Sequence, residues 1–241
     1  MSESKRIIVA LDCSTLTQAY YLLDQLDPKL CRIKIGKEMF TLFGSEIIKT
    51  IISRNFEVFL DLKFHDIPTT VANACKAAAD LGVWMLNVHA LGGLSMLTAA
   101  ANALNTYGTD KPILTAVTVL TSHSHKDLLE IGISLSPEDL AIKLAKLAYQ
   151  AGLDGVVCST QEVSVIKSGT SANFLAVTPG IRLLAENMSA DDQKRIATPE
   201  EAIYAGSDYL VIGRPITQSK DPLCQLQQIT IQINNALVDN N

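Results

Sequence analysis

The sequence lacks the features that mark several specialised protein classes. Its five cysteines are odd in number and scattered, without a C-x-x-C pair, which argues against a disulfide framework and a zinc site. No apolar run approaches the roughly 18 residues of a membrane span, and the apolar run near the N-terminus is too short for a signal peptide. We therefore expect a cytoplasmic protein without a membrane segment.

Positive charge is also scarce. The net charge is −5, which gives no basic field for nucleic acid, although a local basic pocket for a small anion remains compatible with it. What the chain has in abundance is apolar material: 48% of its residues are hydrophobic and only 19% are charged. This composition supports a large core and argues against disorder.

Eight short apolar or β-branched runs recur along the 241 residues, with helical patterns between them. The runs are RIIVALD (6–12), CRIKIG (31–36), EVFLDLK (57–63), WMLNVH (84–89), ILTAVTVL (113–120), GVVCS (155–159), FLAVTPG (174–180) and YLVIGR (209–214). Helix starts are predicted at 136–139 and 198–201, at Asp221-Pro222, and by the capping box of Ser159 and Glu162.

This alternation, without a linker or a break in composition, predicts a single (β/α)8 TIM barrel over residues 1–241. A doubly wound sheet is the alternative. It would require a glycine-rich turn after the first strand, whereas that strand ends in LDCSTLT.

A barrel carries its catalytic groups at the C-terminal ends of its strands. Polar residues stand at these ends in most of the predicted strands, so we expect them to converge on one rim. They are Asp12, Lys34, Asp61, Lys63, His89, Thr121, Arg182 and Arg214.

The segment DLKFHDIPTT (61–70) carries the most informative charges. Alternation along a strand places Asp61 and Lys63 on one face, toward the barrel mouth. One interpretation is a structural ion pair; with Asp12 and Lys34 nearby, an alternating charge array that presents an ammonium group as a proton donor is favoured. A Schiff-base lysine would prefer an apolar or cationic setting.

The histidines give weaker signals. A metal hydrolase on this fold would typically carry H-x-H at the end of the first strand, where this chain has LDC. We interpret His123 and His125 as part of a solvated loop, and His89 as a hydrogen-bond partner of a neighbouring loop. No metal site is predicted.

The last predicted strand runs into IGRPIT. Gly213 and Arg214 precede Pro215, so that backbone N–H groups, a helix start and a guanidinium group favour a phosphate site, with an ordinary strand-to-helix turn as the alternative. A long polar segment at 179–197 is typical of a lid loop.

Together these motifs resemble the orotidine 5′-phosphate decarboxylase family in its bacterial form. The resemblance rests on D-x-K-x-x-D-I-P-x-T in 61–70, LD after the first strand, IKIG, VTVLTS, TPGIR with a following DDQKR, and VIGRPIT, in order along nearly the whole chain. It implies loss of CO2 from orotidine 5′-monophosphate to give uridine 5′-monophosphate, without a cofactor, in a homodimer with composite active sites.

The resemblance also implies roles for individual residues. Lys63 would donate a proton to C6 of the pyrimidine, Asp61 would hold Lys63 beside the departing carboxylate, and Asp66 would complete the array from the partner subunit. Substrate-binding roles are implied for Asp12, Lys34 and, across the dimer, Thr70 (ribose), Thr121 (pyrimidine), and Arg182, Gln193, Gly213 and Arg214 (5′-phosphate), with Gln193 on the lid.

Two other functions stay open at this point. Magnesium-dependent sugar-phosphate decarboxylases and synthases of the same superfamily share D-x-K-x-x-D. They usually carry E-x-G-T-P where this chain has Lys34-Ile35-Gly36-Lys37, so Lys34 argues against that branch. A non-catalytic barrel that serves as a scaffold is the second, and the intact charge array argues against it.

Overall fold

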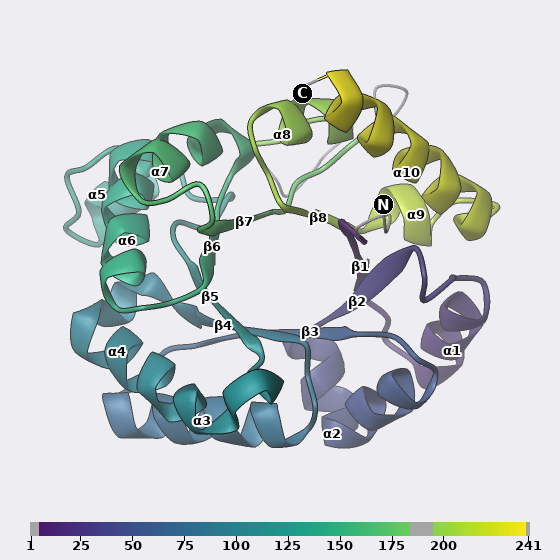
Figure 1. The fold of residues 1–241 in the computed structure, drawn as a ribbon, viewed down its shortest axis with the longest axis horizontal. Coiled ribbons are helices and arrows are strands. Elements are labelled where there is room, and N and C mark those ends of the chain that lie inside the picture. The colour runs from purple at the N-terminus through teal and green to yellow at the C-terminus, as the bar shows by residue number, and fades with distance from the viewer. Residues whose placement is uncertain (1–4, 184–194, 240–241) are drawn as a thin grey trace.

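The predicted strand–helix units close into a barrel. In this computed structural model, which describes residues 5–183 and 195–239, eight parallel strands follow one another around a ring and β8 pairs with β1 (Figure 1). The strands are β1 Ile7–Leu11, β2 Cys31–Gly36, β3 Val58–Phe64, β4 Met85–His89, β5 Ile113–Val117, β6 Gly155–Val157, β7 Leu175–Thr178 and β8 Tyr209–Ile212. The predicted (β/α)8 barrel is confirmed, and the closed ring excludes a doubly wound sheet.

Helices surround the ring. They are α1 Leu16–Asp24, α2 Lys37–Ser53, α3 Pro68–Asp80, α4 Gly93–Leu104, α5 His125–Glu130, α6 Pro137–Gln150, α7 Val163–Gly169, α8 Pro199–Tyr204, α9 Arg214–Thr217 and α10 Pro222–Asp239, with 3-10 turns η1 Ala90–Gly92, η2 Asn105–Asp110 and η3 Thr160–Glu162. The predicted caps are confirmed: Ser136 caps α6, Thr198 forms a capping box on α8, and Ser159 forms one with Glu162. Among the helices described, none is long and apolar enough to cross a membrane.

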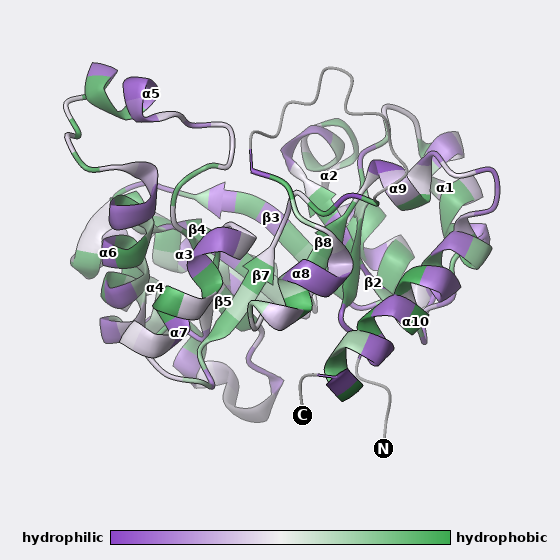
Figure 2. Cartoon of the chain, turned by 90° about the horizontal axis from the view of Figure 1, so that it is seen from above, coloured by the Kyte–Doolittle hydropathy of each residue, from purple (hydrophilic) through white to green (hydrophobic). Residues whose placement is uncertain are grey.

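Several predicted strands are shorter in the structure, and two differences concern the residues that follow a strand. The strand predicted over 209–214 ends at Ile212, because Gly213 leaves the extended conformation and Arg214 already begins α9. The segment around His123 and His125 is not only a loop: Ser124 and Asp127 form a capping box, so that His125 begins α5. This helix projects from the body of the barrel (Figure 2).

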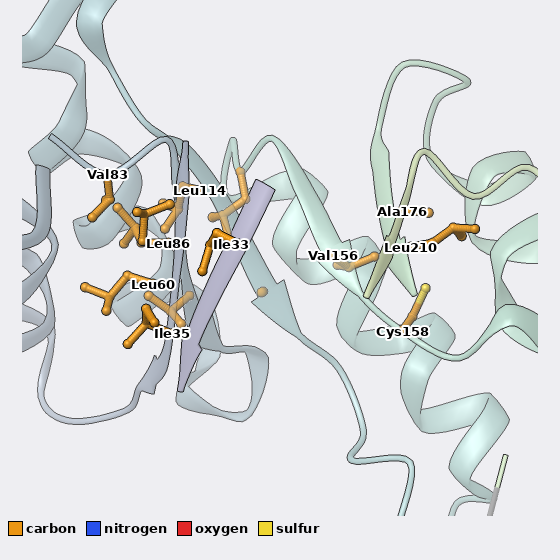
Figure 3. Packing of buried hydrophobic residues seen from close by; sticks show 14 of the residues in the cluster. Ile33, Ile35, Leu60, Val83, Leu86, Leu114, Val156, Cys158, Ala176 and Leu210 are labelled. Atoms are coloured by element: carbon orange, nitrogen blue, oxygen red, sulfur yellow. The ribbon is translucent and has the colours of Figure 1, made fainter. Parts of the chain in front are cut away.

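The apolar residues form two layers. The larger one lies between the outward faces of the strands and the helices, and includes Ile33, Leu60 and Leu86 (Figure 3). The smaller one fills the barrel interior, where Phe59 and Met85 pack among residues from β1, β7 and β8. The interior is therefore a packed core below the mouth, as expected for eight strands.

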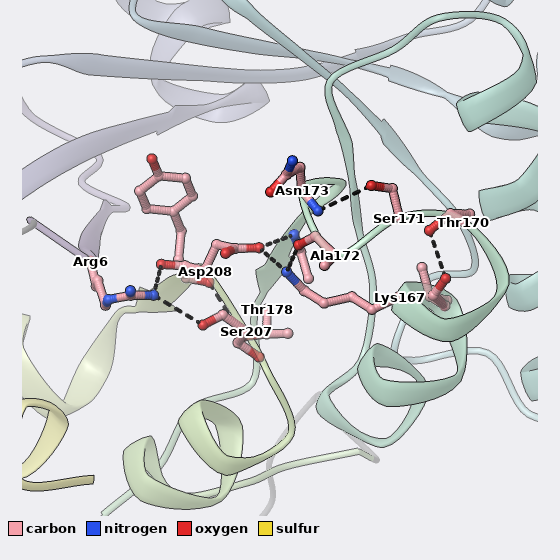
Figure 4. A network of polar contacts seen from close by, with 12 residues as sticks. Arg6, Lys167, Thr170, Ser171, Ala172, Asn173, Thr178, Ser207 and Asp208 are labelled. Atoms are coloured by element: carbon pink, nitrogen blue, oxygen red, sulfur yellow. Dashed lines mark hydrogen bonds and ion pairs between the residues drawn. The ribbon is translucent and has the colours of Figure 1, made fainter. Parts of the chain in front are cut away.

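Polar interactions fasten the opposite, N-terminal end of the barrel. Asp208 accepts hydrogen bonds from Lys167 Nζ and from the backbone N–H of Ala176, both at 2.8 Å, and Arg6 donates to the Asp208 carbonyl at 3.3 Å (Figure 4). Nearby in the barrel floor, the Arg32 guanidinium lies 3.9 Å from the centroid of the Trp84 ring. These contacts lie at the end of the barrel opposite to the predicted site residues.

Gly155, at the start of β6, is required by packing. A Cβ there would meet the carbonyl oxygen of Leu175 on β7 and lie 2.6 Å from the Leu175 Cβ. We expect Gly155→Ala to lower the free energy of unfolding by about 1–3 kcal/mol, because backbone atoms must move. Gly169→Ala is the matched control, since its Cβ would meet only the flexible end of Lys146. Urea denaturation of both variants measures the difference; equal stabilities would contradict the packing argument.

Candidate active site

A cavity of about 650 Å³ opens at the C-terminal ends of the strands. It is lined by residues from seven of the eight strands or the loops that follow them, and most of the predicted site residues are among them. Those are Asp12, Lys34, Asp61, Lys63, Thr121, Arg182, Gly213 and Arg214. Its volume is that of a site for a small organic ligand.

Opposite charges alternate along one wall of this cavity. Lys34 Nζ lies 3.6 Å from Asp12 Oδ1 and 3.5 Å from Asp61 Oδ2, and Lys63 Nζ lies 2.5 Å from Asp61 Oδ1. Asp61 and Lys34 keep only 12% and 11% of their side-chain surface exposed. Partial burial makes these ion pairs stronger than exposed ones and makes a loss of either partner costly.

Asp61 is the central carboxylate of this wall. Burial is the largest single influence on its pKa and acts to raise it. The ammonium groups of Lys34 and Lys63 and the hydrogen bonds from Lys63 and Asn87 act against burial and outweigh it, so the pKa of Asp61 lies below its usual value. Asp61 is therefore ionised near neutral pH and carries a fixed negative charge into the cavity wall.

Asn87, on β4, is a residue that the sequence analysis missed. It is fully buried, and its amide joins Asp61 to Lys63: Nδ2 donates to Asp61 Oδ1 and Oδ1 accepts from the Lys63 backbone N–H, both at 2.7 Å. Lys63 itself has φ = 54°, in the left-handed region that non-glycine residues rarely adopt. The only signal in the sequence was a polar residue within the apolar run WMLNVH.

Asp66 and Thr70 are not brought into the cavity of their own chain. Both are exposed near the start of α3, and Asp66 Oδ1 accepts the Ile67 backbone N–H at 2.6 Å. Gln193, the remaining predicted residue, lies outside the described residues, as does most of the predicted lid.

The end of the cavity that is predicted to bind phosphate is formed by the segments that follow β7 and β8. Gly213 and Arg214 line it from the turn between β8 and α9, and Arg182 lines it from the segment after β7. That segment is held by an isolated bridge between Ile181 and Ala197, and the Arg182 backbone N–H donates to the Ala197 carbonyl at 2.9 Å.

A buried ion pair of Arg195 and Glu162 supports the same region and was also missed. Glu162 is 1% exposed, and Arg195 Nη2 also donates to the Leu120 carbonyl at 3.3 Å. Burial raises the pKa of Glu162, against the lowering effect of Arg195. The ion pair joins the segment before α8 to η3, and the hydrogen bond to Leu120 joins the same segment to the loop before Thr121. The sequence analysis assigned Glu162 to the capping box with Ser159 and therefore did not identify the ion pair. The same carboxylate makes both contacts.

Two histidines near the mouth, His65 and His89, contact each other. His89 Nδ1 accepts the Leu91 backbone N–H at 3.4 Å, in agreement with its predicted loop contact, and its ring stacks on His65 at 5.5 Å between centroids. Burial, followed by the neighbouring histidine and lysine charges, lowers the pKa of His89 to about 4, so it is neutral at physiological pH. Within residues 5–183 and 195–239, no three metal-binding side chains converge.

Comparison with known proteins gives one consistent family. Residues 5–229 match the model of the "Orotidine 5′-phosphate decarboxylase / HUMPS family". A curated orotidine 5′-phosphate decarboxylase from Actinobacillus pleuropneumoniae is 57% identical over 228 residues (95% of this chain, 98% of that protein), and one from Pseudoalteromonas atlantica is 53% identical over 231 residues (96% and 99%). The crystal structure of orotidine 5′-phosphate decarboxylase from Lactobacillus acidophilus superposes with a TM-score of 0.85 at 39% identity, covering 96% of this chain and all of that one.

Proposed function

This chain belongs to the orotidine 5′-phosphate decarboxylase / HUMPS family, and on that premise we propose that it converts orotidine 5′-monophosphate into uridine 5′-monophosphate and CO2. This is the last step of de novo synthesis of the pyrimidine nucleotide UMP. The observation that carries the proposal is the wall of alternating charges, in which Lys63 Nζ lies 2.5 Å from the buried carboxylate of Asp61 at the mouth of the barrel.

The reaction needs a cation next to C6. When the C6–carboxylate bond breaks, its electron pair stays at C6 in an orbital in the ring plane, which the π-system cannot delocalise. An ammonium group at this position stabilises the developing negative charge and then donates a proton to it. Lys63 fills this role, and Asp61 keeps the ammonium group in place beside the leaving carboxylate.

Residues around the cavity would orient the rest of the nucleotide. We propose that Asp12 and Lys34 bind the ribose hydroxyls and that Thr121 contacts the pyrimidine edge. The 5′-phosphate would be bound by Gly213, by the guanidinium groups of Arg182 and Arg214, and by Gln193, whose assignment rests on the family resemblance alone. We propose that the 179–197 segment acts as the lid over this phosphate.

The family description also covers synthases, so the magnesium-dependent alternative needs an argument from the residues. The position between Asp12 and Asp61 is taken by the Lys34 ammonium, 3.6 and 3.5 Å from their oxygens. A divalent cation bound by these carboxylates would lie against that positive charge. The donor set therefore favours cofactor-independent decarboxylation.

We further propose a homodimer with composite sites. Asp66 and Thr70 are exposed on their own chain, outside its cavity, which supports their reaching the cavity of a second copy. The exposed side chain of Ile67, with 66% of its surface accessible, lies between them in the sequence and offers apolar contact area for such an interface.

The first test is an assay of decarboxylation. The protein is treated with EDTA to remove metal ions, and the absorbance of the substrate is followed over time. We expect the wild type to turn over orotidine 5′-monophosphate and Lys63→Ala to lose more than about 90% of kcat, a loss above ~1.4 kcal/mol, because the cation acts on charge that exists chiefly in the transition state. Lys63→Ala should still bind uridine 5′-monophosphate measurably.

Lys37→Ala is the matched control, since it removes an exposed lysine outside the cavity lining. An inactive wild type would remove the proposed function. A wild type that needs magnesium would favour the synthase branch instead. An active Lys63→Ala would leave the function standing and remove Lys63 from its role.

The composite site can be tested by subunit exchange. Asp66→Asn and Lys63→Ala should each be inactive, and a mixture should regain about a quarter of wild-type activity, because half of the dimers are then heterodimers with one intact site. Steady-state rates before and after exchange, with exchange proved by differently tagged subunits, measure this recovery. Continued inactivity after exchange would place Asp66 in the cavity of its own subunit.

Arg214→Ala should impair chemistry at the distant pyrimidine. Contacts to the unreacting phosphate contribute binding energy that holds the base against Lys63, so we expect a loss of roughly 2–4 kcal/mol in kcat/KM. Lys220→Ala, which removes an exposed charge outside the cavity lining, should have no such effect.

The decisive substrate is orotidine, which lacks the phosphate. Wild type and Arg214→Ala should process it at similarly poor rates, since neither can use the phosphate contact. If Arg214→Ala is equally harmful with both substrates, Arg214 supports the fold or the base site and not the phosphate.

A further inference from the structure

Pairing between β3 and β4 is interrupted next to the charge array. Phe59 and Leu60 pair with Met85 and Leu86 in register, but the next pair is Phe64 with Val88. Residues 61–63 of β3 therefore stand opposite a single residue of β4, Asn87. A bulge of this kind removes ladder hydrogen bonds and re-aims side chains, and such bulges are common beside active sites.

The side chain of Asn87 replaces what the ladder loses. Its carbonyl oxygen accepts the backbone N–H of Lys63, where the chain turns to φ = 54°, and its NH₂ group donates to Asp61 Oδ1. Left-handed backbone at a lysine persists only where the surroundings hold it. The orientation of the amide follows from its partners, because the opposite one would set N–H against N–H.

We propose that Asn87 is a positioning residue for decarboxylation, whose amide holds the Lys63 backbone and the Asp61 carboxylate in the arrangement that presents Lys63 Nζ to the substrate. This inference rests on the proposed function. Asn87 is fully buried and does not line the cavity, so it acts through Asp61 and Lys63 alone.

An uncharged group with a donor and an acceptor is what this position requires. Asp61 Oδ1 receives both Lys63 Nζ and Asn87 Nδ2, so the amide fixes the carboxylate without competing for the ammonium group. The charged groups that face Asp61 are Lys34 from β2 and Lys63, with Asp12 beyond Lys34. An added negative charge would disturb this balance of two carboxylates and two ammonium groups.

Asn87→Asp tests the donor separately from the acceptor. The new carboxylate has nearly the same shape and still accepts the Lys63 N–H, but it opposes Asp61 near neutral pH. We expect kcat to fall about 100-fold at pH 8 with KM changed less than about threefold. At pH 5 the two carboxylates can share one proton, which restores the donor, so the ratio of wild-type to variant kcat should shrink at least about tenfold.

Asn87→Ala keeps the experiment decisive if Asn87→Asp does not fold. It removes both hydrogen bonds and adds no carboxylate, so its deficit in kcat, expected to be at least about tenfold, should not recover at pH 5. Thr115→Val is the matched control: Thr115 is fully buried and is the register partner of Asn87 on β5, and its hydroxyl donates to the Leu86 carbonyl at 3.4 Å. It should retain wild-type kcat and its pH profile.

A second readout is independent of turnover. The NMR signal of the Asp61 carboxyl carbon can be assigned by its loss in Asp61→Asn and followed against pH. It should report a higher pKa of Asp61 in Asn87→Ala than in wild type, because one hydrogen-bond donor to the ionised form is lost. A pH profile of kcat parallel to wild type in Asn87→Asp, or an unchanged Asp61 titration in Asn87→Ala, would overturn the positioning role. If the wild type itself does not release CO2 while the Asp61 titration shifts, the proposed function fails and the structural coupling stands.

Discussion

The whole site depends on one buried carboxylate. Asp61 has 12% of its side-chain surface exposed, so its charge must be balanced within the barrel mouth. Lys34, Lys63 and Asn87 supply that balance from three neighbouring strands. Each partner is thereby held in place by the same charge, and the geometry of the cavity wall follows from the need to keep Asp61 ionised.

The backbone of β3 is adapted to this need. In a regular strand, the side chains of residues 61 and 63 would project side by side along one face. The bulge and the left-handed φ of Lys63 bring its ammonium group back to 2.5 Å from Asp61 Oδ1. The D-x-K ion pair therefore forms on a distorted backbone, which the Asn87 side chain of β4 supports through its hydrogen bond to the Lys63 N–H.

The strand periodicity and the D-x-K-x-x-D segment were sufficient to predict the barrel and to place Asp61 and Lys63 at its mouth. Asn87 could not be predicted, because its role depends on a register shift between two strands that leaves no pattern in either one. The Arg195–Glu162 pair joins positions far apart in the chain, and α5 is a short helix whose cap lies among polar residues that also suit a loop. These features arise from tertiary contacts and not from local periodicity.

The two ends of the barrel divide structural and functional tasks. At the N-terminal end, charges such as Lys167 and Asp208 bind each other and the strand backbone, and Arg32 packs on Trp84. These contacts join residues before β1, β7 and β8 and stabilise the closed ring. At the C-terminal end, Lys34 and Lys63 also pair with carboxylates but keep contact with an open cavity of about 650 Å³. Because the packed interior layer around Phe59 separates the two ends, the charges at the mouth can be arranged for the substrate without weakening the closure of the barrel.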